Sequence, residues 1–137
     1  MELVDTNVLL YAVSSDPQDQ AKARAAIEIL RSRQFALSAQ VLQEFYWQAT
    51  RTTRRHRLTS EAALSFLRPL LESPIQDVTP ALVLSAVATA ARFQISYWDA
   101  AIIEAARALG CGTVISADLS DGQEYDGVRV ENPFRNL

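Results

Sequence analysis

The stretch MELVDTNVLLYA, residues 1–12, places an acid between two apolar segments. Leu3 and Val4 are typical of a buried strand, and residues 8–10 are typical of a buried helix. The acid between them is Asp5, which would end the strand in apolar surroundings. Because an unpaired carboxylate is costly to bury, something must compensate its charge. An Asx-turn or a helix N-cap is the structural explanation, and a bound cation is the functional one.

The composition is that of an ordinary globular protein, with 137 residues, 49% hydrophobic, 21% charged and a net charge of −3. No run of about 18 apolar residues predicts a membrane span, and the N-terminus lacks the pattern of a secretory signal. Cys111 is the single cysteine, which excludes an internal disulfide and a cysteine-rich zinc site, and we expect it to be buried. We therefore expect one domain, residues 1–137, in a cytoplasmic protein without membrane contact.

Short apolar strands alternate with helices along the chain. We expect strands at residues 2–5, 35–37, 75–78, 113–116 and 128–130, the last at a sheet edge. Helices are expected to begin after caps at Thr6 or Asn7, Asp16, Ser38, Thr59 and Thr79, and again at Tyr97. The alternation predicts an α/β fold with a mainly parallel central sheet covered by helices on both faces. In such folds the active crevice lies outside the carboxyl ends of the strands.

Four of the sixteen acidic residues are hard to explain as surface charges. Asp5 and Asp118 follow expected strands, while Glu44 and Asp99 lie near the apolar faces of expected helices. Each has a structural alternative: a turn or cap for the first two, an exposed helix position for Glu44, and favourable first-turn placement for Asp99. Together in one crevice, however, four carboxylates would need protons or cations. Oxygen ligands of this kind suit Mg²⁺ or Mn²⁺, whereas one histidine and one distant cysteine do not make a zinc site.

Four motifs, in order along the chain, resemble those of the PIN-domain ribonucleases, in particular the VapC toxins of bacterial toxin–antitoxin pairs. They are DTNVLLY (5–11), QEFYW (43–47), YWDAAI (97–102) and ISADLSDGQ (115–123). The resemblance covers nearly the whole chain and implies a three-layer α/β/α PIN-like domain. It also implies an acidic catalytic quartet made of Asp5, Glu44, Asp99 and Asp118.

In that family pattern Asp5, Asp99 and Asp118 would hold Mg²⁺ (or Mn²⁺), and Glu44 would orient or deprotonate a water. The supporting polar residues would be Asn7, Ser116 and Asp121. The resemblance implies a metal-dependent endoribonuclease that cleaves single-stranded or structured RNA with metal-activated water. It further implies a cognate antitoxin protein and a homodimer, and we expect the antitoxin to dock near Phe45, Trp47 or Phe66.

The stretch RTTRRHR, residues 51–57, concentrates positive charge and contains the only histidine, His56. One interpretation is a phosphate-binding edge for RNA, and the other is an exposed helix end whose cations suit the helix dipole. The arginines in question are Arg51, Arg54, Arg55 and Arg57. Four aromatic residues near the acids could stack on RNA bases, although we favour core packing or a dimer interface for them. These are Tyr46, Trp47, Tyr97 and Trp98.

Other acidic α/β families fit less well. A haloacid-dehalogenase-type phosphatase resembles this chain in its first strand but requires D-x-D there and a later lysine. The second acid is replaced by Asn7, and no lysine follows Lys22. A phospho-receiver domain meets the same objection. The remaining alternative is a catalytically inactive PIN-like module that binds RNA or protein, and the presence of all four acids favours the enzyme over it.

Overall fold

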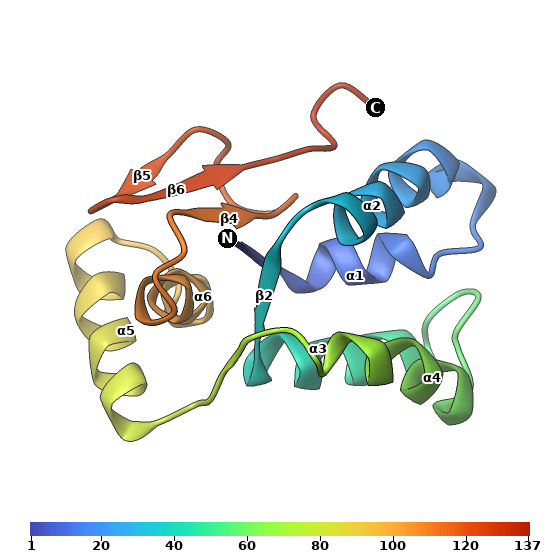
Figure 1. The fold of residues 1–137 in the computed structure, drawn as a ribbon, viewed down its shortest axis with the longest axis horizontal. Helices are drawn as coiled ribbons and strands as arrows, with labels where there is room; N and C mark the ends of the chain where they lie inside the picture. Colours follow the sequence, from blue (N-terminus) through green and yellow to red (C-terminus); the bar gives the residue numbers. More distant parts are fainter.

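The computed structural model describes residues 1–137 and is shown in Figure 1. Its strands are β1 (Glu2–Val4), β2 (Phe35–Ser38), β3 (Ile75–Gln76), β4 (Thr113–Ile115), β5 (Glu124–Tyr125) and β6 (Val128–Glu131). Its helices are α1 (Thr6–Ala12), α2 (Gln20–Ser32), α3 (Ala39–Thr50), α4 (Ser60–Leu70), α5 (Pro80–Phe93) and α6 (Tyr97–Ala108). A 3₁₀ turn, Pro17–Asp19, precedes α2. No helix is both long and apolar enough to span a bilayer.

The strands form one six-stranded sheet in the order β3-β2-β1-β4-β6-β5. Every neighbouring pair is parallel except β5 and β6, which confirms the expected mainly parallel sheet. The expectation that β6 lies at an edge is wrong, because β5 covers it. The two strands are joined by Asp126 and Gly127, both with positive φ, as a tight two-residue hairpin requires.

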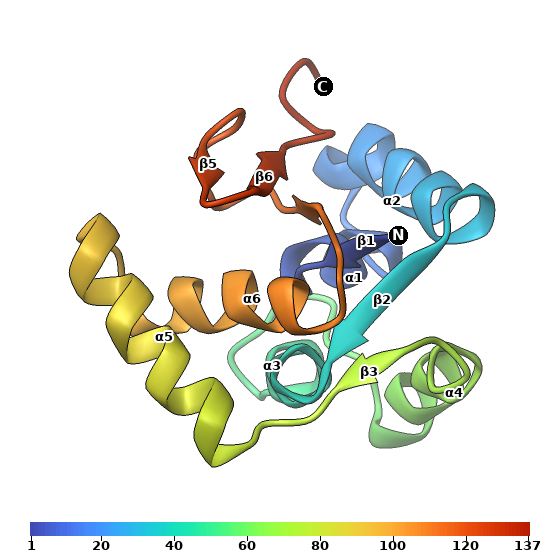
Figure 2. The same ribbon diagram turned by 60° about the vertical axis from the view of Figure 1, so that its left-hand side comes forward.

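Helices cover both faces of this sheet and give the expected three-layer α/β/α architecture. Helices α5 and α6 lie on one side of the strands and α2 lies on the other (Figures 1 and 2). Helix α6 packs against β1, β2, β3, β4 and β6. The central strands β1 and β4 are neighbours in the sheet; β1 leads directly into α1, whereas β4 leads into a loop before β5.

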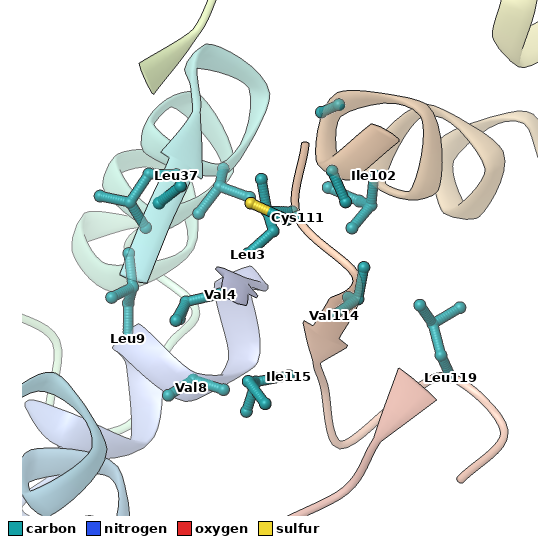
Figure 3. Close-up of a cluster of buried hydrophobic side chains, with 14 of the residues drawn as sticks. Leu3, Val4, Val8, Leu9, Leu37, Ile102, Cys111, Val114, Ile115 and Leu119 are labelled. Atoms are coloured by element: carbon teal, nitrogen blue, oxygen red, sulfur yellow. The ribbon is translucent and has the colours of Figure 1, made fainter. Parts of the chain in front are cut away.

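The core is built from the apolar residues of the central strands and the inward faces of these helices. Leu3 and Val4 of β1 meet Val114 and Ile115 of β4 in the cluster drawn in Figure 3. Cys111 is buried in the same cluster, as expected of a small apolar residue. Burial of the strand residues on both faces explains why they read as continuous apolar runs.

Two local expectations differ from the structure. Helix α1 is capped by Asp5 rather than by Thr6 or Asn7, because the Asp5 side chain accepts from the Thr6 N–H. The cap at Asp16 belongs to the 3₁₀ turn rather than to α2, because the Asp16 side chain accepts from the Gln18 N–H. Helix α2 itself begins only at Gln20.

Candidate functional site

Four carboxylates line one pocket at the carboxyl end of the central strands. Its volume is about 150 Å³. The lining residues come from the start of α1, from α3, from the first turns of α6 and from the segment after β4; they are Asp5, Thr6, Asn7, Leu10, Gln40, Glu44, Gln48, Trp98, Asp99, Ile102 and Asp118. We call this the acid pocket. It contains no lysine, arginine or histidine, so its negative charge is not compensated by the chain itself.

Asp5 is the most deeply buried of the four acids, with 8% of its surface exposed. Its carboxylate accepts from the Thr6 N–H at 2.7 Å and from the Ser116 hydroxyl at 2.8 Å. Burial raises the pKa of Asp5 from its ordinary value of 3.8 to about 6; these two hydrogen bonds lower it, and the Glu44 and Asp118 charges raise it further. Asp5 therefore serves as a helix cap, yet its charge remains costly without a cation.

Asn7 and Ser116 connect the ends of β1 and β4. The Asn7 amide donates to Ser116 Oγ at 3.2 Å, and its oxygen accepts from the Ala117 N–H at 2.9 Å. Ser116 Oγ also accepts from the Asp118 N–H at 3.1 Å. Since Ser116 is fully buried, this network fixes the backbone that presents Asp118 to the pocket. Both residues lie where a supporting role requires them.

Glu44 is held by two residues that the sequence did not single out for this role. Thr6 Oγ1 donates to Glu44 Oε2 at 2.8 Å, and Gln40 Nε2 donates to Glu44 Oε1 at 2.9 Å. Both donors are buried, and each carboxylate oxygen retains lone pairs for another partner. Gln40 precedes Glu44 by one helical turn, and that i, i+4 spacing is the only signal in the sequence.

Asp99 and Asp118 complete the acid pocket from the other side. Asp99 lies in the first turn of α6, where Ser96 caps the helix by accepting from the Asp99 N–H at 3.1 Å. The Asp118 side chain follows β4 and is exposed. Neither carboxylate has a hydrogen-bond or ion-pair partner in the chain, so both are available to a ligand in the pocket.

We compared the whole chain with models of known protein families. The model of the PIN domain family matches residues 3–120. The chain belongs to the PIN-domain family. A search of curated protein sequences found no match.

Solved structures similar to this PIN domain cover nearly the whole chain. VapC20 of Mycobacterium tuberculosis, a toxin that cleaves the sarcin–ricin loop, is 20% identical with a TM-score of 0.66, covering 86% of this chain and 92% of that one. A Klebsiella pneumoniae toxin–antitoxin complex is 21% identical with a TM-score of 0.67, and the match covers 97% of this chain and 98% of that one. FitAcB of Neisseria gonorrhoeae is 20% identical with a TM-score of 0.62, and the match covers 98% of this chain and 99% of that one. At this level of identity the likeness shows a shared fold.

The acid pocket of this PIN domain fits a divalent cation in charge and in donor chemistry. Its acidic donors are all carboxylate oxygens, which suit Mg²⁺ or Mn²⁺. Burial is the main cause of the raised pKa of Asp5, and the charges of Glu44 and Asp118 raise it further. No three of the His, Cys, Asp or Glu side chains are drawn together closely enough to form a metal-binding group. The carboxylates thus line the pocket without converging on one point, and ion binding would require side-chain rotation.

Asp121 lies away from the acid pocket of the PIN domain. Its carboxylate accepts from the Asn132 N–H at 2.8 Å and from Arg135 at 2.6 Å. The Asn132 hydrogen bond and Arg135 lower the pKa of Asp121. It lines a separate hollow beside Glu2 and Arg129. The structure therefore does not bring Asp121 together with the other predicted site residues.

The arginines of residues 51–57 and the aromatic residues also lie in distinct places. Arg51 follows the end of α3, and the other three lie in the turns before α4. None of the four lines the acid pocket. Of the two alternatives favoured for the aromatic residues, core packing is excluded for both tryptophans, because Trp47 is 63% exposed and Trp98 is 64% exposed; the dimer interface stays a prediction. Of the four aromatic residues, only Trp98 lines the acid pocket.

Proposed function

We propose that this PIN domain is a metal-dependent endoribonuclease. The observation that carries the proposal is the acid pocket, where four carboxylates gather without a basic side chain. Asp5 also caps α1 and Asp118 is exposed, but neither role explains why four carboxylates gather at the carboxyl ends of two central strands with no cation from the chain to balance their charge. The family membership supports a nuclease, and RNA as the substrate follows the sequence resemblance.

Asp5, Asp99 and Asp118 would hold Mg²⁺ (or Mn²⁺) in this proposal. When bound, the ion supplies activation of a water molecule and neutralises charge on the phosphodiester. The Asp5 carboxylate is aimed by Thr6 and Ser116, so it can bind without losing its orientation. The backbone N–H of Asp118 is held by Ser116, so the backbone position is set, while the unpartnered side chain would rotate toward the ion.

Glu44 would position the attacking water and accept its proton. The hydrogen bonds from Thr6 and Gln40 hold both of its oxygens, so the carboxylate presents a fixed lone pair to the pocket. No histidine is available for this task, because His56 lies in the exposed turns before α4. The chain's own base is thus a carboxylate.

The basic stretch 51–57 would supply affinity for the RNA backbone, because the acid pocket repels phosphate. None of its four arginines forms an ion pair within the chain; the ion-paired arginines are Arg33, Arg92, Arg107 and Arg135. Unpaired arginines retain the donors that bind phosphate. The acids would carry out the cleavage, and the arginines would contribute only to RNA affinity.

We also propose that the protein is the toxin of a type II pair, acts in the cytoplasm and is restrained by a cognate antitoxin. An apolar hollow of about 590 Å³ between α2 and α4 would receive the antitoxin, and Phe66 and Leu70 line it. Phe45 is fully buried beneath this region, with its ring centroid 5.1 Å from that of Phe66, so Phe66 rather than Phe45 would contact the antitoxin.

A homodimer is part of the same proposal. The face of α5 that turns away from α6 exposes Leu84 and Val87, at 70% and 54%. Exposed apolar residues at i, i+3 spacing along one helix are typical of a surface that packs against another chain. Sedimentation of the purified protein tests this, and a monomer at micromolar concentration would contradict it.

The test is cleavage of defined RNAs by purified protein with Mg²⁺ or Mn²⁺, beside Asp99→Asn and a matched Asp77→Asn control. Asp77 is exposed and lies outside the acid pocket. We expect cleavage by the parent and by Asp77→Asn, and none after Asp99→Asn or EDTA. Equal cleavage by all three proteins would mean contamination. RNA that is bound but left intact by every protein would favour the inactive binding module.

A further inference from the structure

Trp98 combines two properties that no other aromatic residue of the chain shares. It lines the acid pocket directly beside Asp99, and 64% of its surface is exposed. The residues that follow it in α6, Ala100–Ala106, are all buried. A large aromatic ring at the rim of a charged pocket offers a flat, uncharged face to a ring of a ligand whose charged group lies in the pocket.

The position of Trp98 is fixed by its neighbours. Its backbone carbonyl accepts from Gln40 Nε2 at 3.4 Å, and the same amide group donates to Glu44. Its ring meets the Tyr97 ring edge-on, with centroids 5.0 Å apart at 85°. The backbone at Trp98 is therefore tied to α3, while the indole contacts the Tyr97 ring and most of the Trp98 surface remains open.

The size of the pocket decides what can lie against Trp98. At about 150 Å³ it is smaller than the 300 to 1,000 Å³ typical of sites that enclose an organic ligand. A phosphate group and its ions fit this space, but a nucleotide with its base does not. The base attached to a phosphate in the pocket must lie at the rim, where Trp98 is the aromatic lining residue.

We propose that the Trp98 indole is the stacking platform for the base next to the scissile phosphate of a single-stranded RNA. The inference rests on the proposed ribonuclease function and adds the contact that holds the substrate at the cleavage site. Every base can stack on a neutral aromatic ring, and the negative charge of the carboxylates does not repel such a contact. Phosphate attraction alone would hold the backbone near the arginines without placing one linkage over the acids.

Tryptophan emission tests the contact directly, because Trp47 and Trp98 are the only tryptophans. Trp47→Phe leaves Trp98 as the single reporter, and Asp118→Asn prevents cleavage during titration. The probes are a 12-nucleotide single-stranded RNA and a chain of equal length that carries abasic sites throughout. We expect the RNA to quench Trp98 emission and the abasic chain to leave it unchanged.

A binding titration with Trp98→Leu and Trp98→Phe completes the test. We expect Trp98→Leu to weaken RNA binding about tenfold and to leave binding of the abasic chain and the salt dependence unchanged, while Trp98→Phe retains most of the affinity. In cleavage assays of the protein with Asp118 intact, Trp98→Leu should raise KM more than it lowers kcat.

Three results would overturn the proposal. RNA that binds to Trp47→Phe/Asp118→Asn without any change in Trp98 emission, and that is cleaved by the protein with Asp118 intact, would refute stacking and leave the ribonuclease standing. Emission that shifts with protein concentration in the absence of RNA, together with dissociation of a dimer by Trp98→Leu, would assign Trp98 to a subunit interface. Failure of every protein to bind or cleave RNA would remove the proposed function and this inference with it.

Discussion

Replacing Asp5 by asparagine is expected to stabilise the metal-free protein at neutral pH. The pKa of Asp5 rises from 3.8 to about 6 on folding, so the folded state holds this proton more tightly than the unfolded state does. Its contribution to stability is complete below pH 3.8 and is lost as the pH rises through 6. At pH 8 the ionised carboxylate costs the folded state about 3 kcal/mol.

Asparagine removes that cost but also changes the hydrogen bonds. Its oxygen can accept from the Thr6 N–H, while its amide group replaces the oxygen that accepts from Ser116. The loss of one buried hydrogen bond costs about 1 kcal/mol, which leaves a net gain of roughly 2 kcal/mol at pH 8. For a chain of 137 residues this corresponds to a Tm increase of roughly 7 °C.

The assay is thermal denaturation in EDTA at pH 4, 6 and 8 for the parent protein, Asp5→Asn and Asp77→Asn. The advantage of Asp5→Asn over the parent should grow with pH and vanish or reverse at pH 4, while Asp77→Asn follows the parent. Added Mg²⁺ or Mn²⁺ at 100 times its Kd should stabilise the parent by about 2.7 kcal/mol and the variant far less. A variant that is less stable than the parent at pH 8, or an advantage independent of pH, would refute the reasoning.

Three more outcomes follow from the described contacts. Gln40→Leu removes one hydrogen-bond donor to Glu44. In cleavage assays we expect it to lower kcat about tenfold to a hundredfold and to leave the RNA affinity unchanged. An unchanged kcat would contradict a positioning role for Gln40. Replacing Arg54 and Arg55 together by alanine should weaken RNA binding and reduce its salt slope by about 2, measured by titration at several salt concentrations; an unchanged slope would exclude phosphate contact. Phe66→Glu places a charge in the apolar hollow beside α4 and should abolish co-purification with the co-expressed antitoxin while cleavage persists; retained co-purification would locate the antitoxin elsewhere.

The strand-to-helix junction at Asp5 shows what a sequence conveys well. Apolar runs identify the central strands because parallel strands are buried on both faces, and polar caps identify the helix starts because they satisfy the free N–H groups of the first turn. Ser38, Thr59 and Thr79 each cap the helix that follows them, as expected. Acids at the carboxyl ends of neighbouring strands then follow from topology, which is why the acid pocket could be anticipated.

Other features depend on contacts that no local pattern encodes. The donors to Glu44 are Thr6 and Gln40, and Thr6 lies 38 positions away in the chain. The sequence shows both as ordinary polar residues at helix starts. Asp121 is separated from Asp118 by only three positions, yet the turn after β4 carries it to Arg135. The exposure of Trp98 was equally hidden, because aromatic residues are usually buried and composition alone favours the core.

The hydrogen bond between Ser116 and Asp5 joins residues 111 positions apart. Its formation requires the first and fourth strands to pair, and that pairing closes a loop spanning most of the chain. During synthesis the chain therefore contains three acids of the pocket, Asp5, Glu44 and Asp99, before it contains the strand β4 that orders Asp5. The acid pocket is therefore completed only when β4 and Asp118 join the earlier segments, and a nascent chain that stops before β4 lacks it.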